Sequence, residues 1–222
     1  MPGPDFILET EAVEYLKRFQ IAYPEHRLAR TPDEAAAAAA QIGFPVVLKI
    51  VSPQVVHKSE VGGVAVELGS AEEVRLKAAG ILETVQRNIP NAVIEGLLVC
   101  AQAKPGVEVI VGGLRDAIFG PAVMVGLGGI FTEILKDVTF RVYPLSEEEA
   151  LKMLGELKGY PLLTGARGQK AVDLKALAVL AVSVARMMHE CPEVAELDLN
   201  PVLAYPEGLM PVDARLSVTE KN

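Results

Sequence analysis

The stretch Gly43-Phe-Pro-Val-Val-Leu-Lys-Ile-Val51 contains a single charged residue, Lys49, inside an otherwise apolar run. A short apolar run bounded by glycine and proline predicts a buried β-strand. Lysine is almost never fully buried without a partner, because a lone ammonium group in apolar surroundings is costly. The pattern therefore favours an anionic ligand at Lys49. The alternatives are a salt bridge and a lysine whose aliphatic stem reaches out to solvent.

The next segment, Val55-Val-His-Lys-Ser-Glu-Val-Gly-Gly-Val64, places His57 ahead of two glycines, Gly62 and Gly63. Glycine amides can approach a phosphate closely, so this loop fits phosphate binding. Neutral imidazole is a competent nucleophile that can accept a phosphoryl group, which makes His57 the candidate catalytic residue. A glycine pair before a strand is also typical of a plain turn, and a lone histidine is often structural. On these residues alone, both alternatives stay open.

Composition excludes several classes of protein. The chain has 222 residues, half of them apolar, so it can bury a sizeable core. A net charge of −8 without a basic stripe argues against nucleic acid as a partner. We expect no leader sequence and no membrane span, and the two distant cysteines, Cys100 and Cys191, favour the reducing cytoplasm. The remaining histidines, His26 in a predicted loop and His189 at a predicted helix end, add no metal-ligand spacing.

Helix and strand signals alternate along the chain. Three helices are expected to begin with a capping box, in which a hydroxyl and a carboxylate three residues later satisfy backbone amides. Two more helices are expected at 11–19 and 174–189, and the short segment 101–106 is the predicted hinge. The capping boxes pair Thr31 with Glu34, Ser70 with Glu73, and Ser146 with Glu149. The β-rich segments are 45–51, 63–68, 93–100, 107–111, 122–125, 140–143, 196–203 and 210–213.

A glycine-rich segment, Gly126-Leu-Gly-Gly-Ile130, opens the run up to Asp137. It matches neither a Walker loop nor the dinucleotide-binding fingerprint, so a P-loop enzyme is not supported. One interpretation is a turn between strands. The other is a backbone cradle, with Glu133 and Arg141 available for a substrate or partner. The roles of these two residues and of Arg167 stay open.

Oxygen-bearing side chains gather near the C-terminus. In Glu196-Leu-Asp-Leu-Asn-Pro201, strand alternation puts Asp198 and Asn200 on one face and the leucines on the other. A hairpin turned at 206–208 would bring Asp213 beside them. Carboxylate and amide oxygens suit Mg²⁺, which completes its shell with phosphate and water. The alternative is a solvated strand face.

In their order, these segments resemble the ATP-grasp superfamily, and closely the β subunit or fused domain of ADP-forming acetyl-CoA synthetases. The resemblance implies an α+β fold of the α/β type, with two lobes and the nucleotide between them. It divides a single ATP-grasp domain, 1–222, into a small lobe at 21–98 and a second lobe at 99–222, with 1–20 as a helix packed on the latter. The residues that carry it are Gly43-Phe-Pro-Val-Val-Leu-Lys49, His57-Lys-Ser-Glu-Val-Gly-Gly63, Gly126-Leu-Gly-Gly-Ile130, Leu197-Asp-Leu-Asn-Pro201 and Val212-Asp-Ala-Arg215, with the opening helix and the Pro24 loop.

The resemblance implies roles for the nucleotide-binding residues of the first half of the chain. Lys49 is similar to the lysine that contacts ATP phosphates, and Gly62 with Gly63 to the loop that covers them. The segment 98–102 is similar to the hinge that presents backbone groups to adenine. Cys100 stands there at a position where related synthetases often have an acidic residue. Glu108 falls where an acid contacts the ribose.

The resemblance also implies the chemistry. Asn200 and Asp213 fall at expected Mg²⁺ ligands, with Asp198 as a further candidate. His57 is similar to the second phosphohistidine of these enzymes, which passes a phosphoryl group between a CoA-binding α subunit and ADP. The expected protein is therefore a cytoplasmic acetate–CoA ligase subunit that uses ATP/ADP and Mg²⁺ in a heterotetramer. The alternatives are another ATP-grasp carboxylate ligase and a non-catalytic nucleotide-binding module; the acyl group and the choice between ADP and GDP stay open.

Overall fold

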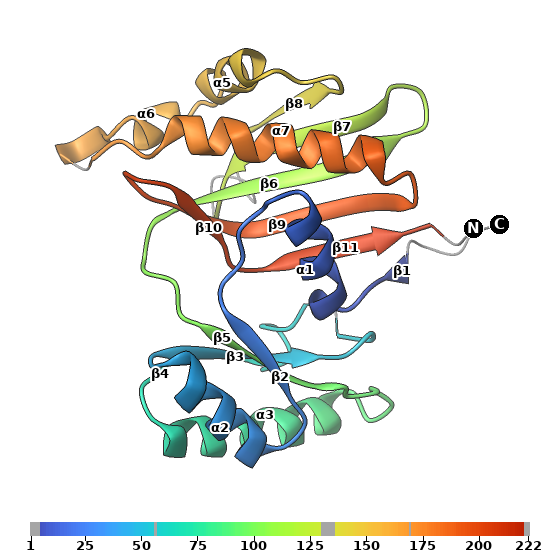
Figure 1. The fold of residues 1–222 in the computed structure, drawn as a ribbon, viewed down its shortest axis with the longest axis vertical. Helices are drawn as coiled ribbons and strands as arrows, with labels where there is room; N and C mark the ends of the chain where they lie inside the picture. Colours follow the sequence, from blue (N-terminus) through green and yellow to red (C-terminus); the bar gives the residue numbers. More distant parts are fainter. Residues whose placement is uncertain (1–4, 56, 130–135, 169, 220–222) are drawn as a thin grey trace. The chain divides into compact units, whose positions relative to one another are not determined.

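The computed structural model describes residues 5–55, 57–129, 136–168 and 170–219 (Figure 1). The chain divides into two compact units, each with its own sheet. Unit 1 comprises the described residues within 1–23 and 104–222, and unit 2 comprises 24–103. The chain therefore passes between units at Tyr23–Pro24 and again at Ala103–Lys104. The second crossing lies inside the segment 101–106 that the sequence predicts as a hinge.

Unit 2 is a four-stranded antiparallel sheet with two helices packed on one face. The strand order is β2-β5-β3-β4, and the helices join the strands in a single apolar cluster. Alternate residues of the central strands, such as Leu48 and Val99, fill that cluster. The elements are β2 (His26–Ala29), α2 (Pro32–Ile42), β3 (Val46–Val51), β4 (Val64–Leu68), α3 (Ala71–Asn88) and β5 (Gly96–Ala101).

Local sequence sets the helix ends in unit 2. The Thr31 and Ser70 hydroxyls accept hydrogen bonds from the amides three residues later, at 3.1 and 3.2 Å, which confirms both predicted N-caps. The glutamates differ from the capping-box pattern. Glu34 accepts from the amide of Arg30, one residue before the cap, and not from the cap itself. Helix α2 ends at Gly43, whose φ of 96° suits glycine.

Unit 1 contains a seven-stranded antiparallel sheet in the order β1-β11-β9-β6-β7-β8, with β10 also paired to β9. Its strands are β1 (Asp5–Phe6), β6 (Val107–Asp116), β7 (Gly120–Leu127), β8 (Val138–Val142), β9 (Val194–Ala204), β10 (Leu209–Pro211) and β11 (Ala214–Val218). Its helices are α1 (Glu9–Arg18), α5 (Glu147–Gly155), α6 (Tyr160–Leu163), the 3₁₀ turn Ala166–Gly168 and α7 (Leu174–Glu190).

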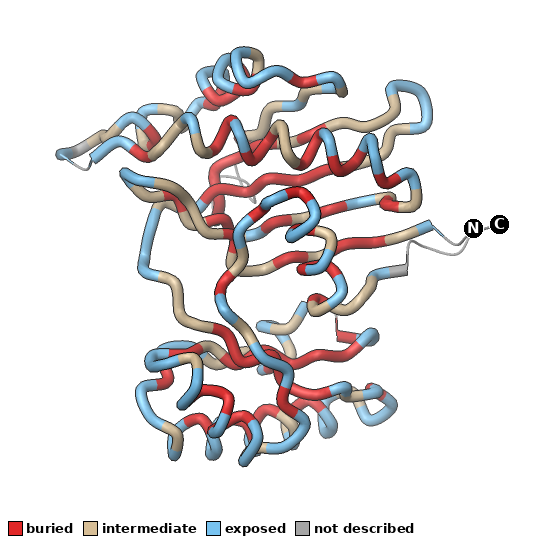
Figure 2. Tube along the Cα trace, in the orientation of Figure 1, coloured by how far each residue is buried: buried red, intermediate tan, exposed pale blue. Residues whose placement is uncertain are grey.

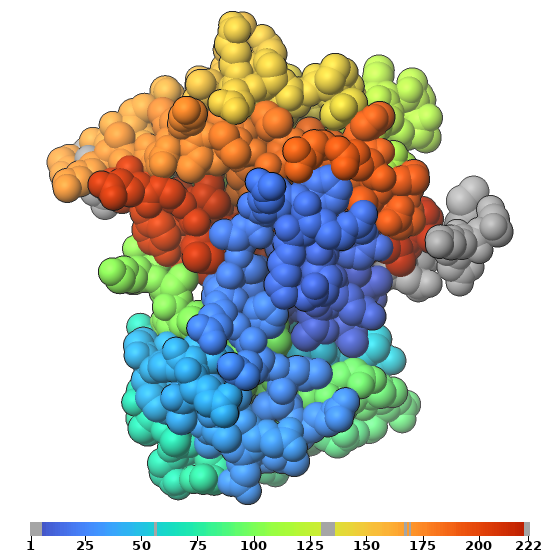
Figure 3. All heavy atoms as spheres, in the orientation of Figure 1, coloured from blue at the N-terminus to red at the C-terminus, as the bar shows by residue number. Residues whose placement is uncertain are grey.

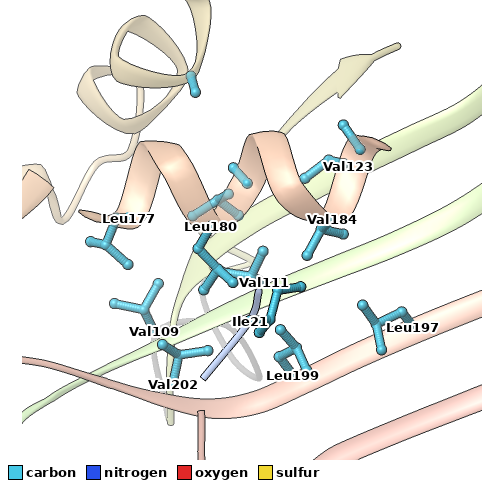
Figure 4. Close-up of a cluster of buried hydrophobic side chains, with 14 of the residues drawn as sticks. Ile21, Val109, Val111, Val123, Leu177, Leu180, Val184, Leu197, Leu199 and Val202 are labelled. Atoms are coloured by element: carbon cyan, nitrogen blue, oxygen red, sulfur yellow. The ribbon is translucent and has the colours of Figure 1, made fainter. Parts of the chain in front are cut away.

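The core of unit 1 lies between the sheet and its helices. Side chains of α7 meet those of the central strands, as the close-up shows, and Ile21 from the segment after α1 joins them (Figure 4). Burying this apolar surface is the main force that fixes α1 and α7 on one face of the sheet. Buried and exposed residues alternate along α1 and α7 (Figure 2), and α1 lies at the surface of unit 1 (Figure 3). The labelled α7 residues are Leu177, Leu180 and Val184.

Some elements differ from those that the sequence predicts. The prediction of a loop at His26 is wrong, because His26 begins β2 and pairs with Cys100. Strand β6 continues through Gly112 and Gly113, where glycines suggested an end. A side chain at Gly113 would lie 2.7 Å from Met188, so glycine there permits α7 to pack closely. Strand β11 was not predicted. Within the described part of the chain, no helix is long and apolar enough to cross a membrane.

Candidate functional site

Lys49 lies on the face of the unit 2 sheet opposite α2 and α3. Its neighbours Leu48 and Ile50 point into the helix-side cluster, so strand alternation turns Lys49 the other way. It pairs with Val64 on one side and Leu98 on the other. Lys49 is only 7% exposed, which confirms the predicted burial. A buried ammonium group held by two neighbouring strands is suited to an anionic ligand.

His57 occupies the turn between β3 and β4. Its side chain is 60% exposed, and Nδ1 lies 3.8 Å from a carboxylate oxygen of Glu60. Unlike Lys49, it is open to a reactant that arrives from solvent or from another protein. An exposed imidazole is accessible as a nucleophile, and the catalytic role of His57 stays a prediction.

The turn itself requires glycine at positions 62 and 63, whether or not a ligand binds there. Gly62 has a φ of +73°, and a side chain on Gly63 would come within 2.4 Å of Ile50. Their amides donate to the carbonyl oxygens of Ser59 and Lys58, at 3.2 and 2.7 Å. Phosphate binding by these two amides therefore requires the turn to open first. The role predicted for them from the resemblance stays a prediction.

Cys100 lies near the end of β5, the strand between β2 and β3. It is 3% exposed, and its register partners are His26 of β2 on one side and Val47 of β3 on the other. The next two amides are engaged within unit 2, because Ala101 donates to Glu25 and Gln102 to Pro45. The Gln102 side-chain oxygen accepts from the amide of Glu67 at 2.6 Å, which ties the start of the second crossing to β4.

In unit 1, β9 carries polar side chains on the sheet face opposite α7, which we call the far face. Leu197 and Leu199 are buried in the core, whereas Asp198 is partly buried and Asn200 is exposed. This confirms the alternation predicted from the sequence. Arg215 of β11 is the register partner of Asp198. It is a residue of the far face to which the sequence reasoning gave no role.

The charges on the far face act on one another. Burial is the main cause that raises the pKa of Asp198, and the nearby charge of Asp213 raises it further. Arg215 and a hydrogen bond with Asn200 lower the same pKa, but less than burial raises it. The Nε of Arg215 lies 3.8 Å from Asp213 Oδ2. The residues predicted as a metal site thus form one electrostatically linked group.

Asp213 lies in the two-residue connection between β10 and β11. The predicted hairpin is present, since β10 pairs antiparallel with β9, and the amide of Val212 donates to Pro201 at 3.0 Å. In the described ranges, no three His, Cys, Asp or Glu side chains are arranged to hold a metal by themselves. Two carboxylates and an amide nevertheless fit Mg²⁺, which takes few protein ligands and fills its shell with phosphate and water.

Glu108 is exposed at the start of β6, against the glycine-rich segment. The amide of Gly128 donates to the Glu108 carbonyl oxygen at 2.8 Å, and a side chain on Gly128 would lie 2.7 Å from Glu108 Cβ. Gly129 has a φ of +62°. Glycine is therefore required for this close approach. Glu133 lies outside the described residues, as does the side chain of Arg167.

Arg141, the other residue suggested for a substrate or partner, is already engaged. Its Nη1 lies 3.1 Å from one carboxylate oxygen of Glu156, and its Nη2 contacts the other. Glu149 also lies near the guanidinium group. These carboxylates raise the pKa of Arg141, mainly through the hydrogen bonds of Glu156. Arg141 thus joins β8 to α5.

A family model described as an ATP-grasp domain matches residues 3–218. The chain belongs to the ATP-grasp family. This confirms the predicted fold class, which the two sheets with their helices also fit.

Relatives of this ATP-grasp chain share most of its length. It is 48% identical over 210 residues to the β subunit of acetate–CoA ligase [ADP-forming] I of Pyrococcus furiosus, covering 95% of this chain and 90% of that one. A solved structure of Candidatus Korarchaeum cryptofilum dinucleotide forming acetyl-coenzyme A synthetase 1 contains coenzyme A, Ca-AMPCP and HgCl⁺. It is 53% identical with a TM-score of 0.95, covering 98% and 95% of the two chains.

A further structure of the Korarchaeum enzyme contains coenzyme A and Mg-AMPPCP. Its phosphohistidine segment points towards the nucleotide binding site. That chain is 48% identical with a TM-score of 0.85, covering 97% of this chain and 93% of that one.

Proposed function

We propose that this chain is the nucleotide-binding β subunit of an ADP-forming acetate–CoA ligase. The overall reaction converts acyl-CoA, phosphate and ADP into the free acid, CoA and ATP, and it is reversible. The observation that carries the proposal is the near full-length match to the Pyrococcus β subunit. The exposure of His57 supports a role in group transfer.

The nucleotide is ATP or ADP with Mg²⁺. The relatives that bind Mg-AMPPCP and Ca-AMPCP support this choice. Lys49 neutralises the phosphates, the end of β5 at Cys100 meets adenine through backbone groups, and Glu108 meets the ribose. Asn200 and Asp213 hold the cation, with Asp198 as a further ligand. When bound, Mg²⁺ neutralises phosphate charge and orients the transferred group.

His57 carries the phosphoryl group between the partner and the nucleotide. Its imidazole nitrogen attacks the phosphorus of a phosphohistidine on the partner, so a new P–N bond forms at His57 as the partner's P–N bond breaks. A terminal phosphate oxygen of ADP then attacks, the P–N bond to His57 breaks, and ATP forms. The protein contributes positioning and charge neutralisation beyond the histidine itself.

A CoA-binding α subunit supplies the rest of the reaction. The β-subunit name of the Pyrococcus relative supports a separate partner chain. The isolated chain is therefore inactive in making acyl-CoA, and the assembled enzyme is a heterotetramer of two α and two β subunits. The acyl group is selected by the partner.

The test is His57→Asn in the enzyme assembled with its α subunit. The variant should lose acyl-CoA-dependent ATP synthesis and should no longer carry acid-labile radiolabelled phosphate on this chain. The matched control is His189→Asn, because His189 is an exposed histidine that stacks on Tyr143 in unit 1. Full ATP synthesis by His57→Asn would contradict the transfer of the phosphoryl group through His57. A wild-type chain without acid-labile label would favour a ligase that activates carboxylates directly.

A further inference from the structure

Arg215 is a partly buried arginine of β11 whose guanidinium group makes no hydrogen bond to any described residue. Its side chain is 28% exposed. Its one ion pair within the described ranges joins Nε to Asp213 Oδ2 at 3.8 Å. That distance allows electrostatic attraction but is too long for a hydrogen bond. The described part of the chain therefore leaves the N–H donors of Arg215 open.

Other arginines of unit 1 in similar surroundings are hydrogen-bonded. The side chain of Arg141 is 25% exposed, close to the value for Arg215, and both of its terminal nitrogens contact the carboxylate of Glu156. Arg115 donates to two backbone carbonyl oxygens at 3.2 and 3.0 Å. A guanidinium group has five N–H donors, and taking such donors out of water without partners is costly. Arg215 is therefore suited to an anionic ligand.

The sheet places Arg215 among the residues proposed to hold the cation. Ala214 and Leu216 are buried in the core of unit 1, so strand alternation turns Arg215 to the far face. Its register partner on β9 is Asp198. Asp213 precedes Arg215 by two residues in the sequence. The guanidinium group thus stands beside two carboxylates.

The chemistry of this cluster selects phosphate oxygens as the anion. A guanidinium group has no acceptor atom and cannot bind a cation, so its ligand beside a cation site must be an anion. Two carboxylates outnumber one guanidinium group, so the cluster by itself is negative, and a divalent cation reverses that sign. The planar N–H fork of arginine matches two oxygens of one phosphoryl group. During phosphoryl transfer, negative charge is spread over the equatorial oxygens of the group that moves.

We propose that Arg215 is a catalytic residue that binds the terminal phosphoryl group of ATP. The inference rests on the proposed function, because it takes the far face of unit 1 as the cation site. The guanidinium group donates hydrogen bonds to two oxygens of the phosphoryl group and stabilises their charge during transfer. No bond to Arg215 forms or breaks. In ATP synthesis the P–N bond to His57 breaks as the P–O bond to ADP forms, and the reverse reaction exchanges the same two bonds.

The experiment compares two nucleotides in Arg215→Met, in the enzyme assembled with its α subunit. ADP lacks the terminal phosphoryl group, whereas AMPPCP, the analogue present in a structure of the Korarchaeum relative, has a terminal phosphonate in its place. With excess Mg²⁺, calorimetry should show about 10-fold to 100-fold weaker AMPPCP binding, and ADP binding within about twofold of the wild type. Arg215→Lys keeps the charge without the planar fork, so it should recover part of the AMPPCP affinity.

The rate of ATP synthesis gives a second measurement. At saturating Mg-ADP, Arg215→Met should be about 100-fold to 1,000-fold slower than the wild type, because it loses a donor to the transferred group. The matched control is Arg186→Met. Arg186 lies on α7, on the other side of the sheet, and its Nε is 3.6 Å from Glu190 in an exposed ion pair. This control removes the same charge from unit 1 and should keep the wild-type rate and affinities.

The outcomes separate this inference from the proposed function. Equal losses of ADP and AMPPCP affinity in Arg215→Met would overturn the inference, because Arg215 would then act only on the cation site. Unchanged AMPPCP affinity would also overturn it. If the wild-type chain carries acid-labile phosphate normally in either case, the proposed function stands. If the wild-type chain carries none, the role of His57 fails, and the comparison of ADP with AMPPCP still decides the contact of Arg215.

Discussion

Arg215 and Asp198 are register partners on β11 and β9, on the face of the sheet opposite α7. The arginine is close enough to lower the pKa of Asp198, yet burial outweighs it and the pKa stays above its ordinary value. The pair is therefore not an ion pair optimised for stability. Burial destabilises the ionised form of Asp198, and such a carboxylate is consistent with a ligand role, because a metal ion would supply the missing positive charge.

Replacing Asp198 with asparagine should stabilise the chain near neutral pH. A raised pKa means that the folded state binds the proton more tightly than the unfolded chain, so ionisation of Asp198 costs stability. That cost is absent below the ordinary carboxyl pKa of about 4 and complete above the raised one. Asp198→Asn should therefore raise the Tm by a few degrees at pH 7, and the gain should vanish towards pH 4.

Melting curves between pH 4 and pH 8 check this prediction. The control is Asp116→Asn, because hydrogen bonds from the amides of Phe119 and Ile118 lower the pKa of Asp116. Its effect has the opposite sign: the asparagine variant should lose stability at pH 7 and match the wild type at low pH. A lower Tm for Asp198→Asn at pH 7 would mean that the attraction to Arg215 outweighs burial.

Lys49→Met should abolish most nucleotide affinity without unfolding unit 2. Methionine keeps an unbranched side chain in the apolar surroundings of β3 and removes the ammonium group. The loss of a charge-assisted contact to phosphate corresponds to about 10-fold to 100-fold weaker ADP binding by calorimetry. Lys17→Met is the matched control, since Lys17 forms an exposed ion pair with Glu14. Unchanged ADP affinity in Lys49→Met would contradict the phosphate role.

Two glycine substitutions in unit 2 should have opposite effects on stability. Gly63→Ala places a methyl group 2.4 Å from the Ile50 side chain, and should cost about 1–3 kcal/mol of unfolding free energy. Gly80→Ala lies in the interior of α3, where nothing is within 4 Å of the new methyl group. It should stabilise by about 0.5–1 kcal/mol. Denaturant unfolding measures both, and a neutral Gly63→Ala would show that the loop moves freely.

The local sequence was sufficient to predict the features that depend only on residues close together along the chain. Thr31, Ser70 and Ser146 cap their helices because the accepting hydroxyl and the donating amide are three residues apart. Lys49 was placed in a buried strand, and the faces of β9 were assigned correctly, because strand alternation depends only on neighbouring residues. The order of these segments then identified the ATP-grasp fold.

Contacts between distant segments decided the rest. His26–Ala29 lacks β-branched residues and becomes a strand only because β5 offers it a free edge. Gly113 continues β6 because Met188, 75 residues later by number, packs against it. The amides of Gly62 and Gly63 are committed to the turn, which no pattern in the sequence indicates. The sequence by itself determined the capped helices, the buried strand that carries Lys49, the two faces of β9, the family and the candidate residues. The tertiary structure alone decided that Arg215 is the register partner of Asp198, because this depends on pairing across the sheet. It also decided that Tyr23 lies near Val212, because this depends on packing of the first helix.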